Sequence, residues 1–86
     1  MSTFTSLTYH VVFGTKHRRP LIARNVRDEL YSYIGGIIRD ERGHLLEIGG
    51  MQDHIHILAG FGPAAAVSDM LRQIKAGSSK WLNERD

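Results

Sequence analysis

The chain has 86 residues, no cysteine and a formal net charge of +2, so we expect one small domain over residues 1–86 whose core forms without disulfides or a thiolate zinc site. No apolar run approaches the ~20 residues that a bilayer span needs, and the start MSTFTSLTYH lacks the pattern of a signal peptide, which indicates a cytoplasmic protein without a membrane partner. The small positive charge permits a nucleic-acid partner but does not argue for one.

The first predicted element is a strand over Leu7 to Phe13, where the sequence LTYHVVF alternates between two faces. The more apolar face, which carries Tyr9, is expected to lie under helices, and His10 is expected on the opposite, open face. The loop GTKHRRP follows and gathers basic residues before Pro20, whose ring disfavours helical backbone in the preceding residue. We therefore expect a basic loop between a strand and a helix.

The period of the apolar residues then changes to that of an α-helix. One helical stripe is formed by Val26, Leu30, Tyr33, Ile34, Ile37 and Ile38. Asn25 is expected to be the N-cap, Asp28–Glu29 to lie in the first turn and Gly43 to end the helix. The pair Gly35–Gly36 inside the helix is expected to allow a close approach to the sheet, since glycine in a helix costs about 1 kcal/mol relative to alanine.

Two strands and a second helix complete the predicted order. The strands run from about His44 to Ile48 and from Asp53 to Gly60, and the helix begins near Ala65 to Ser68 and runs to about Asn83. The string βαββα is an α+β, ferredoxin-like βαββαβ fold without its last strand. Such a fold has an antiparallel sheet with both helices on one face and the other face open.

The predicted strand DHIHILAG places two imidazoles together. Alternation puts His54 and His56 on one face and only apolar residues on the other, so the histidines are expected on the open face. Two residues along a strand span about 6.5 Å, which allows both rings to bind one cation and leaves its other positions to oxygen ligands. Polar filling of an exposed strand face is the alternative for so short a motif.

Three ordered blocks carry a resemblance to a known family. TYHVVFGTKHRRPLI, GGMQDHIHILAGF and SDMLRQIKAGSSKWL resemble the single-tyrosine, IS200-like transposases of bacterial and archaeal insertion sequences, which belong to the His-hydrophobic-His (HUH) nuclease superfamily. Each block alone is weak, but their order and spacing are specific. The resemblance extends over essentially the whole chain.

The resemblance implies a function. Members of this family use a ferredoxin-like domain, usually as a homodimer, to recognise hairpins in single-stranded DNA at the ends of the element. The residues that match their motif histidines, His54 and His56, would hold Mg²⁺ or Mn²⁺ against the scissile phosphate. A tyrosine on a later helix attacks that phosphate and forms a 5′-phosphotyrosine, and the released 3′-hydroxyl allows strands to be rejoined.

The same comparison shows a departure from the family pattern. The family's nucleophile follows a fourth strand, whereas no tyrosine follows His56 here. Tyr9 and Tyr33 are expected on helix-covered or buried faces and Tyr31 on the surface, so none is expected to be a nucleophile. We expect a chain that keeps the metal-binding and DNA-binding core, is truncated before the catalytic tyrosine and is inactive alone.

Further residues have a possible functional role and also an ordinary structural explanation. Asp53 could orient an imidazole or cap a turn, and His10 could be an additional ligand, a phosphate contact or polar surface. Trp81 lies on the apolar arc of the last helix, which favours a core position over base stacking. The candidate contacts to the DNA backbone, which could also simply solvate the surface, are Lys16, Arg18, Arg19, Arg72, Lys75 and Lys80.

Two other function classes remain open. A noncatalytic module that binds single-stranded nucleic acid is possible because a ferredoxin-like sheet with an open face is also how RRM domains bind RNA, although the RRM aromatics are missing here. A metal-dependent hydrolase unrelated to DNA has little support, because two histidines lack an accompanying carboxylate cluster.

Overall fold

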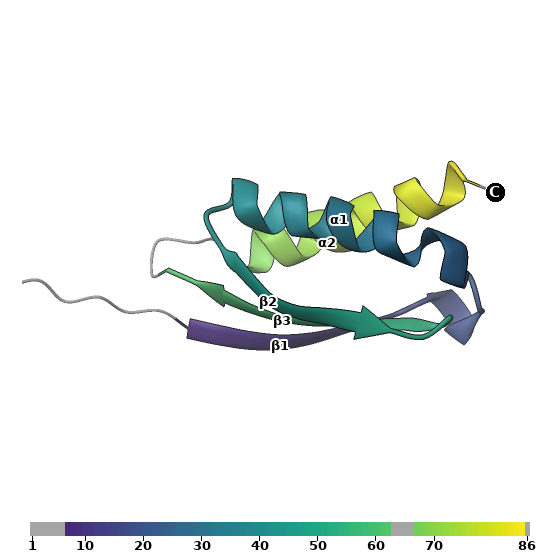
Figure 1. The fold of residues 1–86 in the computed structure, drawn as a ribbon, viewed down its shortest axis with the longest axis horizontal. Helices are drawn as coiled ribbons and strands as arrows, with labels where there is room; N and C mark the ends of the chain where they lie inside the picture. The colour runs from purple at the N-terminus through teal and green to yellow at the C-terminus, as the bar shows by residue number, and fades with distance from the viewer. Residues whose placement is uncertain (1–6, 63–66, 86) are drawn as a thin grey trace, which may run out of the picture.

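The computed structural model describes residues 7–62 and 67–85, and its elements follow the predicted order (Figure 1). They are β1 (Leu7–Gly14), a 3-10 turn (Lys16–Arg18), α1 (Arg24–Asp40), β2 (His44–Gly50), β3 (His54–Phe61) and α2 (Val67–Asn83). The predicted start of the last helix lies partly outside the described residues. Neither described helix is long and apolar enough to cross a bilayer.

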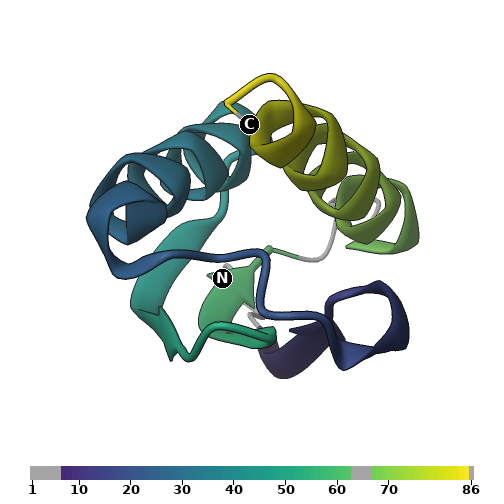
Figure 2. The same ribbon diagram turned by 90° about the vertical axis from the view of Figure 1, so that its right-hand side faces the viewer.

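The described strands form an antiparallel sheet in the order β1-β3-β2. Both helices cover the same face, and the opposite face stays open (Figures 1 and 2). This arrangement confirms the predicted α+β, ferredoxin-like architecture. The central strand β3 places His56 opposite Val12 of β1 and Gly49 of β2. The histidine motif therefore lies at the start of the central strand, on the open face.

The core lies between the sheet and the helices, as the two periodicities predict. Ile55, Ile57 and Ala59 of β3 are buried beneath the helical stripe. Ile22, which sequence periodicity does not assign to any element, is buried as well, because the segment after the basic loop folds back against the sheet. Tyr9 is half-buried and packs on Phe61 with ring centroids 5.8 Å apart.

The start of α1 differs from the prediction. The helix begins at Arg24, so Ala23 and not Asn25 is its N-cap, and Ala23 makes no side-chain capping bond. Asp28–Glu29 lies beyond the first turn, which contains no acidic residue. The helix can begin early because Ile22 is anchored by its own burial and by the hydrogen bond from its backbone N–H to the Gln52 carbonyl (2.9 Å).

The prediction for Gly35–Gly36 was only half right. A Cβ at Gly35 would lie 3.4 Å from Leu45 of β2, which is ordinary contact, whereas a Cβ at Gly36 would meet no described atom within 4 Å. Gly36 therefore does not bring the helix closer to the sheet.

The end of α1 is closed by a hydrogen-bonded Schellman motif. Arg42 N–H donates to the Arg39 carbonyl (2.9 Å), and Gly43 N–H donates to the Ile38 carbonyl (2.8 Å). The left-handed residue is Arg42 (φ 63°), whereas glycine is usual at this position. Gly43 was predicted as the stop, but the helix ends at Asp40 and Gly43 has a packing role. A Cβ there would collide with the ring of Phe61 and lie 2.9 Å from Ile38 Cγ2.

We expect Gly43→Ala to lower the free energy of unfolding by about 1–3 kcal/mol, because the added methyl group overpacks buried Phe61 and Ile38. Urea denaturation followed by circular dichroism measures the change. Gly36→Ala is the matched control and should stabilise the chain by up to about 1 kcal/mol, since alanine is the better helix former. Equal effects of the two substitutions would contradict the packing role of Gly43.

Candidate functional site

The two motif histidines lie next to each other on the open face of β3. The ring centroids of His54 and His56 are 6.5 Å apart with an angle of 33° between the planes. Both residues are half-buried, so their ring nitrogens are not enclosed in the core. The prediction that the pair faces away from the helices is confirmed by the burial of Ile55 and Ile57, which alternate with it.

The ring of His56 lies over Gly49 of the neighbouring strand. A Cβ at Gly49 would be 3.0 Å from His56 Nε2 and 3.1 Å from its Cε1. Any side chain at position 49 would therefore compete with the imidazole for the same space. Gly49 was not singled out from the sequence, and its position beside a histidine became visible only with the register of β2 and β3.

Asp53 connects His54 to the basic loop. Its carboxylate accepts a hydrogen bond from the His54 ring at Nδ1 (3.0 Å) and another from Arg18 Nε (3.1 Å). The bond from His54, and next the bond from Arg18, lower the pKa of Asp53, so the carboxylate is ionised at neutral pH. With its proton on Nδ1, a neutral His54 presents the lone pair of Nε2, which is the form that binds a metal.

The backbone around Asp53 holds the loop in place. The Asp53 carbonyl accepts a hydrogen bond from the N–H of Thr15 (2.9 Å). The single hydrogen of the Thr15 hydroxyl is best placed for the Arg19 carbonyl (2.6 Å), and the Asp53 carbonyl is farther from that hydroxyl (3.2 Å). Between these anchor points, His17 and Arg18 both have φ of 57°, a left-handed conformation that non-glycine residues rarely adopt. The loop is thus fixed beside the histidine pair in one specific conformation.

The side chains at the histidine pair supply only part of the ligand set of a divalent cation. In the part of the chain that the structure describes, no three His, Cys, Asp or Glu side chains are gathered closely enough to hold a metal. His10 lies edge-on to His56 with ring centroids 6.3 Å apart, but it does not complete a three-residue set. The two imidazoles fit a cation whose other ligands are oxygens from solvent or phosphate, with Asp53 as the group that orients His54.

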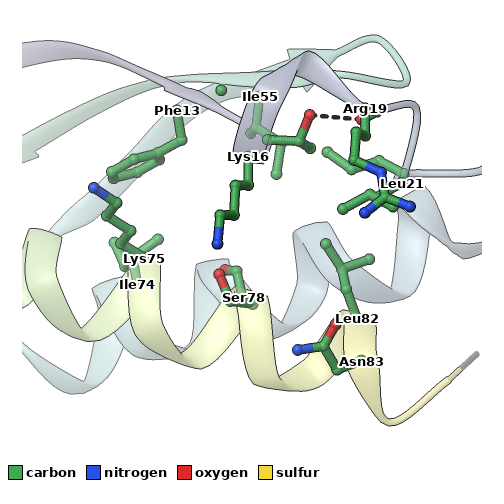
Figure 3. A pocket seen from close by; sticks show the side chains of 14 residues that line it. Phe13, Lys16, Arg19, Leu21, Ile55, Ile74, Lys75, Ser78, Leu82 and Asn83 are labelled. Atoms are coloured by element: carbon green, nitrogen blue, oxygen red, sulfur yellow. Dashed lines mark hydrogen bonds between the residues drawn. The ribbon is translucent and has the colours of Figure 1, made fainter.

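Only three of the six basic candidates line the same pocket. Lys16 and Arg19 of the loop and Lys75 of α2 line one pocket between β1 and α2 (Figure 3). Arg18 is bound to Asp53. Arg72 pairs with Asp69 (3.2 Å), and exposed Lys80 does not line the pocket. The structure therefore groups three of the six residues and gives Arg18 a separate place at the histidine pair.

The tyrosines of the chain lie away from the histidines. Tyr9 is paired with Ala59, so its side chain is on the helix-covered face of the sheet. Tyr33 stacks on Trp81 with ring centroids 6.3 Å apart, and Trp81 is a buried core residue, as predicted. Tyr31, on the same helix α1, was expected at the surface but is half-buried, and this burial raises the pKa of its hydroxyl.

A sequence model of the family described as "Transposase IS200 like" matches residues 3–86. The chain belongs to the IS200-like transposase family. It is 31% identical over 77 residues to the transposase for insertion sequence element IS200 of Salmonella typhimurium, which covers 90% of this chain and 51% of that protein. It is 26% identical over 74 residues to the ISDra2 transposase TnpA of Deinococcus radiodurans, covering 86% of this chain and 53% of that protein.

A solved structure has the same fold as this IS200-like chain. A crystal structure of a Deinococcus radiodurans protein described as a transposase superposes with a TM-score of 0.87 at 24% identity, covering 99% of this chain and 65% of that one. This transposase-family chain spans about half the length of the curated relatives it matches.

Proposed function

We propose that this chain provides the metal-binding and DNA-binding part of a transposase that recognises single-stranded or hairpin DNA and transfers strands through a 5′-phosphotyrosine. The observation that carries the proposal is the His54–His56 pair on the open face, with Asp53 joining His54 to the basic loop. Membership of the IS200-like family supports a DNA partner and metal dependence. Assembly as a homodimer is part of the proposal.

His54 and His56 would hold the cation, Mg²⁺ or Mn²⁺. Such an ion, when bound, polarises a phosphoryl oxygen and stabilises the charge that develops during strand cleavage. Asp53 keeps the proton of His54 on Nδ1, so that Nε2 remains a ligand. Arg18, bound to the same carboxylate, holds Asp53 in position and keeps the loop next to the site.

The chain's own tyrosines do not supply the nucleophile of this reaction. Tyr9 is on the wrong face of the sheet, and Tyr33 is stacked on Trp81. In this proposal the attacking hydroxyl therefore belongs to a residue outside the three tyrosines of the sequence. The second candidate function follows from the same observation: a chain without a positioned nucleophile could act as a noncatalytic module that binds single-stranded nucleic acid.

A labelled DNA hairpin separates these possibilities. We expect the chain to retard the hairpin in a native gel but to give no covalent protein–DNA adduct in a denaturing gel with Mn²⁺, because no tyrosine is positioned at the histidine pair. The longer ISDra2 transposase is the comparison run beside it. An adduct with this chain would disprove the absence of a nucleophile, and tighter binding of an RNA hairpin than of the DNA hairpin would favour the noncatalytic module.

A further inference from the structure

A pocket of about 590 Å³ lies between the end of β1 and α2, on the helix-covered side of the sheet (Figure 3). This volume lies within the range of small-molecule sites. Its walls are apolar where they meet the core and include Phe13, Ile55 and Leu82. The histidine pair is on the opposite face, because Ile55 alternates with His54 and His56 along β3. The pocket is therefore distinct from the candidate metal site.

A buried hydroxyl group in the pocket wall lacks a partner. Ser78 is only 9% exposed and lines the pocket, and its Oγ makes no hydrogen bond to any described residue. A buried polar group without a partner destabilises a fold. The Oγ atom itself is almost inaccessible, so it can bond to a group in the pocket only after the Ser78 side chain rotates to another staggered rotamer.

Two lysines face the same space from opposite sides. Lys16 extends from the loop across the pocket toward the turn of α2 that carries Ser78, and Lys75 lies on α2 beside Phe13 (Figure 3). Lys75 and Ser78 are three residues apart, which places them on one side of the helix. The guanidinium of Arg19 lines the other end of the pocket. Three cations and a free hydroxyl group beside an apolar wall suit an anion that carries an apolar ring.

We propose that this pocket binds one nucleotide, with its phosphate at Lys16, Lys75 and the Ser78 hydroxyl and its base against Phe13, Ile55 and Leu82. The choice of a nucleotide as the ligand rests on the proposed DNA function, whereas the anion site rests on the pocket alone. Phosphate accepts several hydrogen bonds at once, so it satisfies both ammonium groups and the unpaired hydroxyl. An unpaired nucleotide of a DNA strand supplies this chemistry.

Titration of the ¹⁵N-labelled chain with thymidine 5′-monophosphate tests the proposal. We expect amide shifts at Phe13, Lys75 and Ser78, and weaker binding of thymidine, which lacks the phosphate. Ser78→Ala should weaken binding about tenfold, which corresponds to one hydrogen bond to a charged group. The same substitution should raise the thermal midpoint, since it removes an unpaired buried hydroxyl. A purely structural serine would not combine weaker binding with higher stability.

Lys75→Gln is the second variant, because Lys75 is exposed and its replacement leaves the core intact. Lys80→Gln is its matched control on the same helix outside the pocket. Loss of binding with Lys75→Gln but not with Lys80→Gln supports the site, and equal binding by both variants overturns it. Inorganic phosphate that binds as tightly as thymidine 5′-monophosphate would disprove the role of the apolar wall. Pocket amides that shift with protein concentration alone would show that a second copy fills the pocket and would also overturn the proposal.

The hairpin experiment distinguishes failure of this inference from failure of the proposed function. Hairpin DNA that binds equally well to the wild-type chain and to Ser78→Ala, while the mononucleotide does not bind, refutes the pocket and leaves DNA binding intact. A mononucleotide that binds in the pocket while hairpin DNA does not bind supports the pocket and refutes the DNA function.

Discussion

Replacing His54 and His56 together by alanine is expected to abolish Mn²⁺ binding and to leave the fold intact. The two imidazoles are the only nitrogen ligands proposed for the cation, and both lie half-buried on the open face, away from the core beneath the helices. Paramagnetic broadening in ¹⁵N-labelled protein measures the effect. In the wild type, broadening should centre on His54, His56 and Gly49, whose backbone lies under the His56 ring.

Two single variants serve as comparisons. Asp53→Asn should weaken Mn²⁺ binding about 10- to 100-fold, because the neutral amide holds His54 less firmly in the tautomer that leaves Nε2 free. His44→Ala, an exposed histidine at the start of β2, should leave binding unchanged. Broadening that persists in the double variant, or that centres on His44, would show that the ion binds elsewhere.

The helices and strands could be predicted because the apolar residues within each element recur at the period of an α-helix or of a β-strand. Leu30, Ile34 and Ile38 lie on one side of α1, and Ile55 and Ile57 alternate with the histidines in β3. These patterns record which face of an element is buried, so they also placed the histidine pair on the open face. The α1 N-terminus could not be predicted in the same way, because it depends on the burial of Ile22 and on its bond to Gln52, which are contacts between distant segments.

The site could be predicted only where its residues are close in sequence. His54 and His56 are two residues apart, and Asp53 precedes them, so the motif was visible as a string. The bond from Arg18 to Asp53 joins residues 35 positions apart, and it depends on two left-handed residues in the loop that no propensity favours. The roles of Gly49 and Ser78 were not predicted, because a glycine near the end of a predicted strand and a serine in a helix are common. The importance of Gly49 depends on the neighbouring His56 ring, and that of Ser78 on its unpaired hydroxyl.

For the exposed basic residues of α2, the sequence predicted the side of the helix but not the neighbouring elements. Helical periodicity placed Arg72, Lys75 and Lys80 on the polar side of α2, and all three are exposed. Periodicity cannot show that Lys75 alone faces the loop, because the angle between α2 and β1 is set by core packing. The structure thus divides a set of residues that looked equivalent in the sequence, and the division is testable with DNA.

Removing the three basic residues of the pocket is expected to weaken binding of hairpin DNA strongly. Lys16, Arg19 and Lys75 converge on one pocket, so the triple glutamine variant should lose at least about tenfold in affinity at low salt. Each phosphate contact on a single strand contributes about 0.7 to the slope of log affinity against log salt, so three lost contacts should reduce the slope by about 2. Fluorescence anisotropy over a salt series measures both quantities.

A second triple variant separates the position of the charges from their number. Arg24→Gln, Arg39→Gln and Arg42→Gln also remove three positive charges, but these exposed residues do not line the pocket and are not among the candidate DNA contacts. This variant should keep most of the salt slope, because long-range attraction is screened within a Debye length of about 10 Å at 0.1 M salt, whereas direct phosphate contacts release counterions. If both triple variants lose the same slope, DNA binding depends on net charge, and the grouping of Lys16, Arg19 and Lys75 has no role in it.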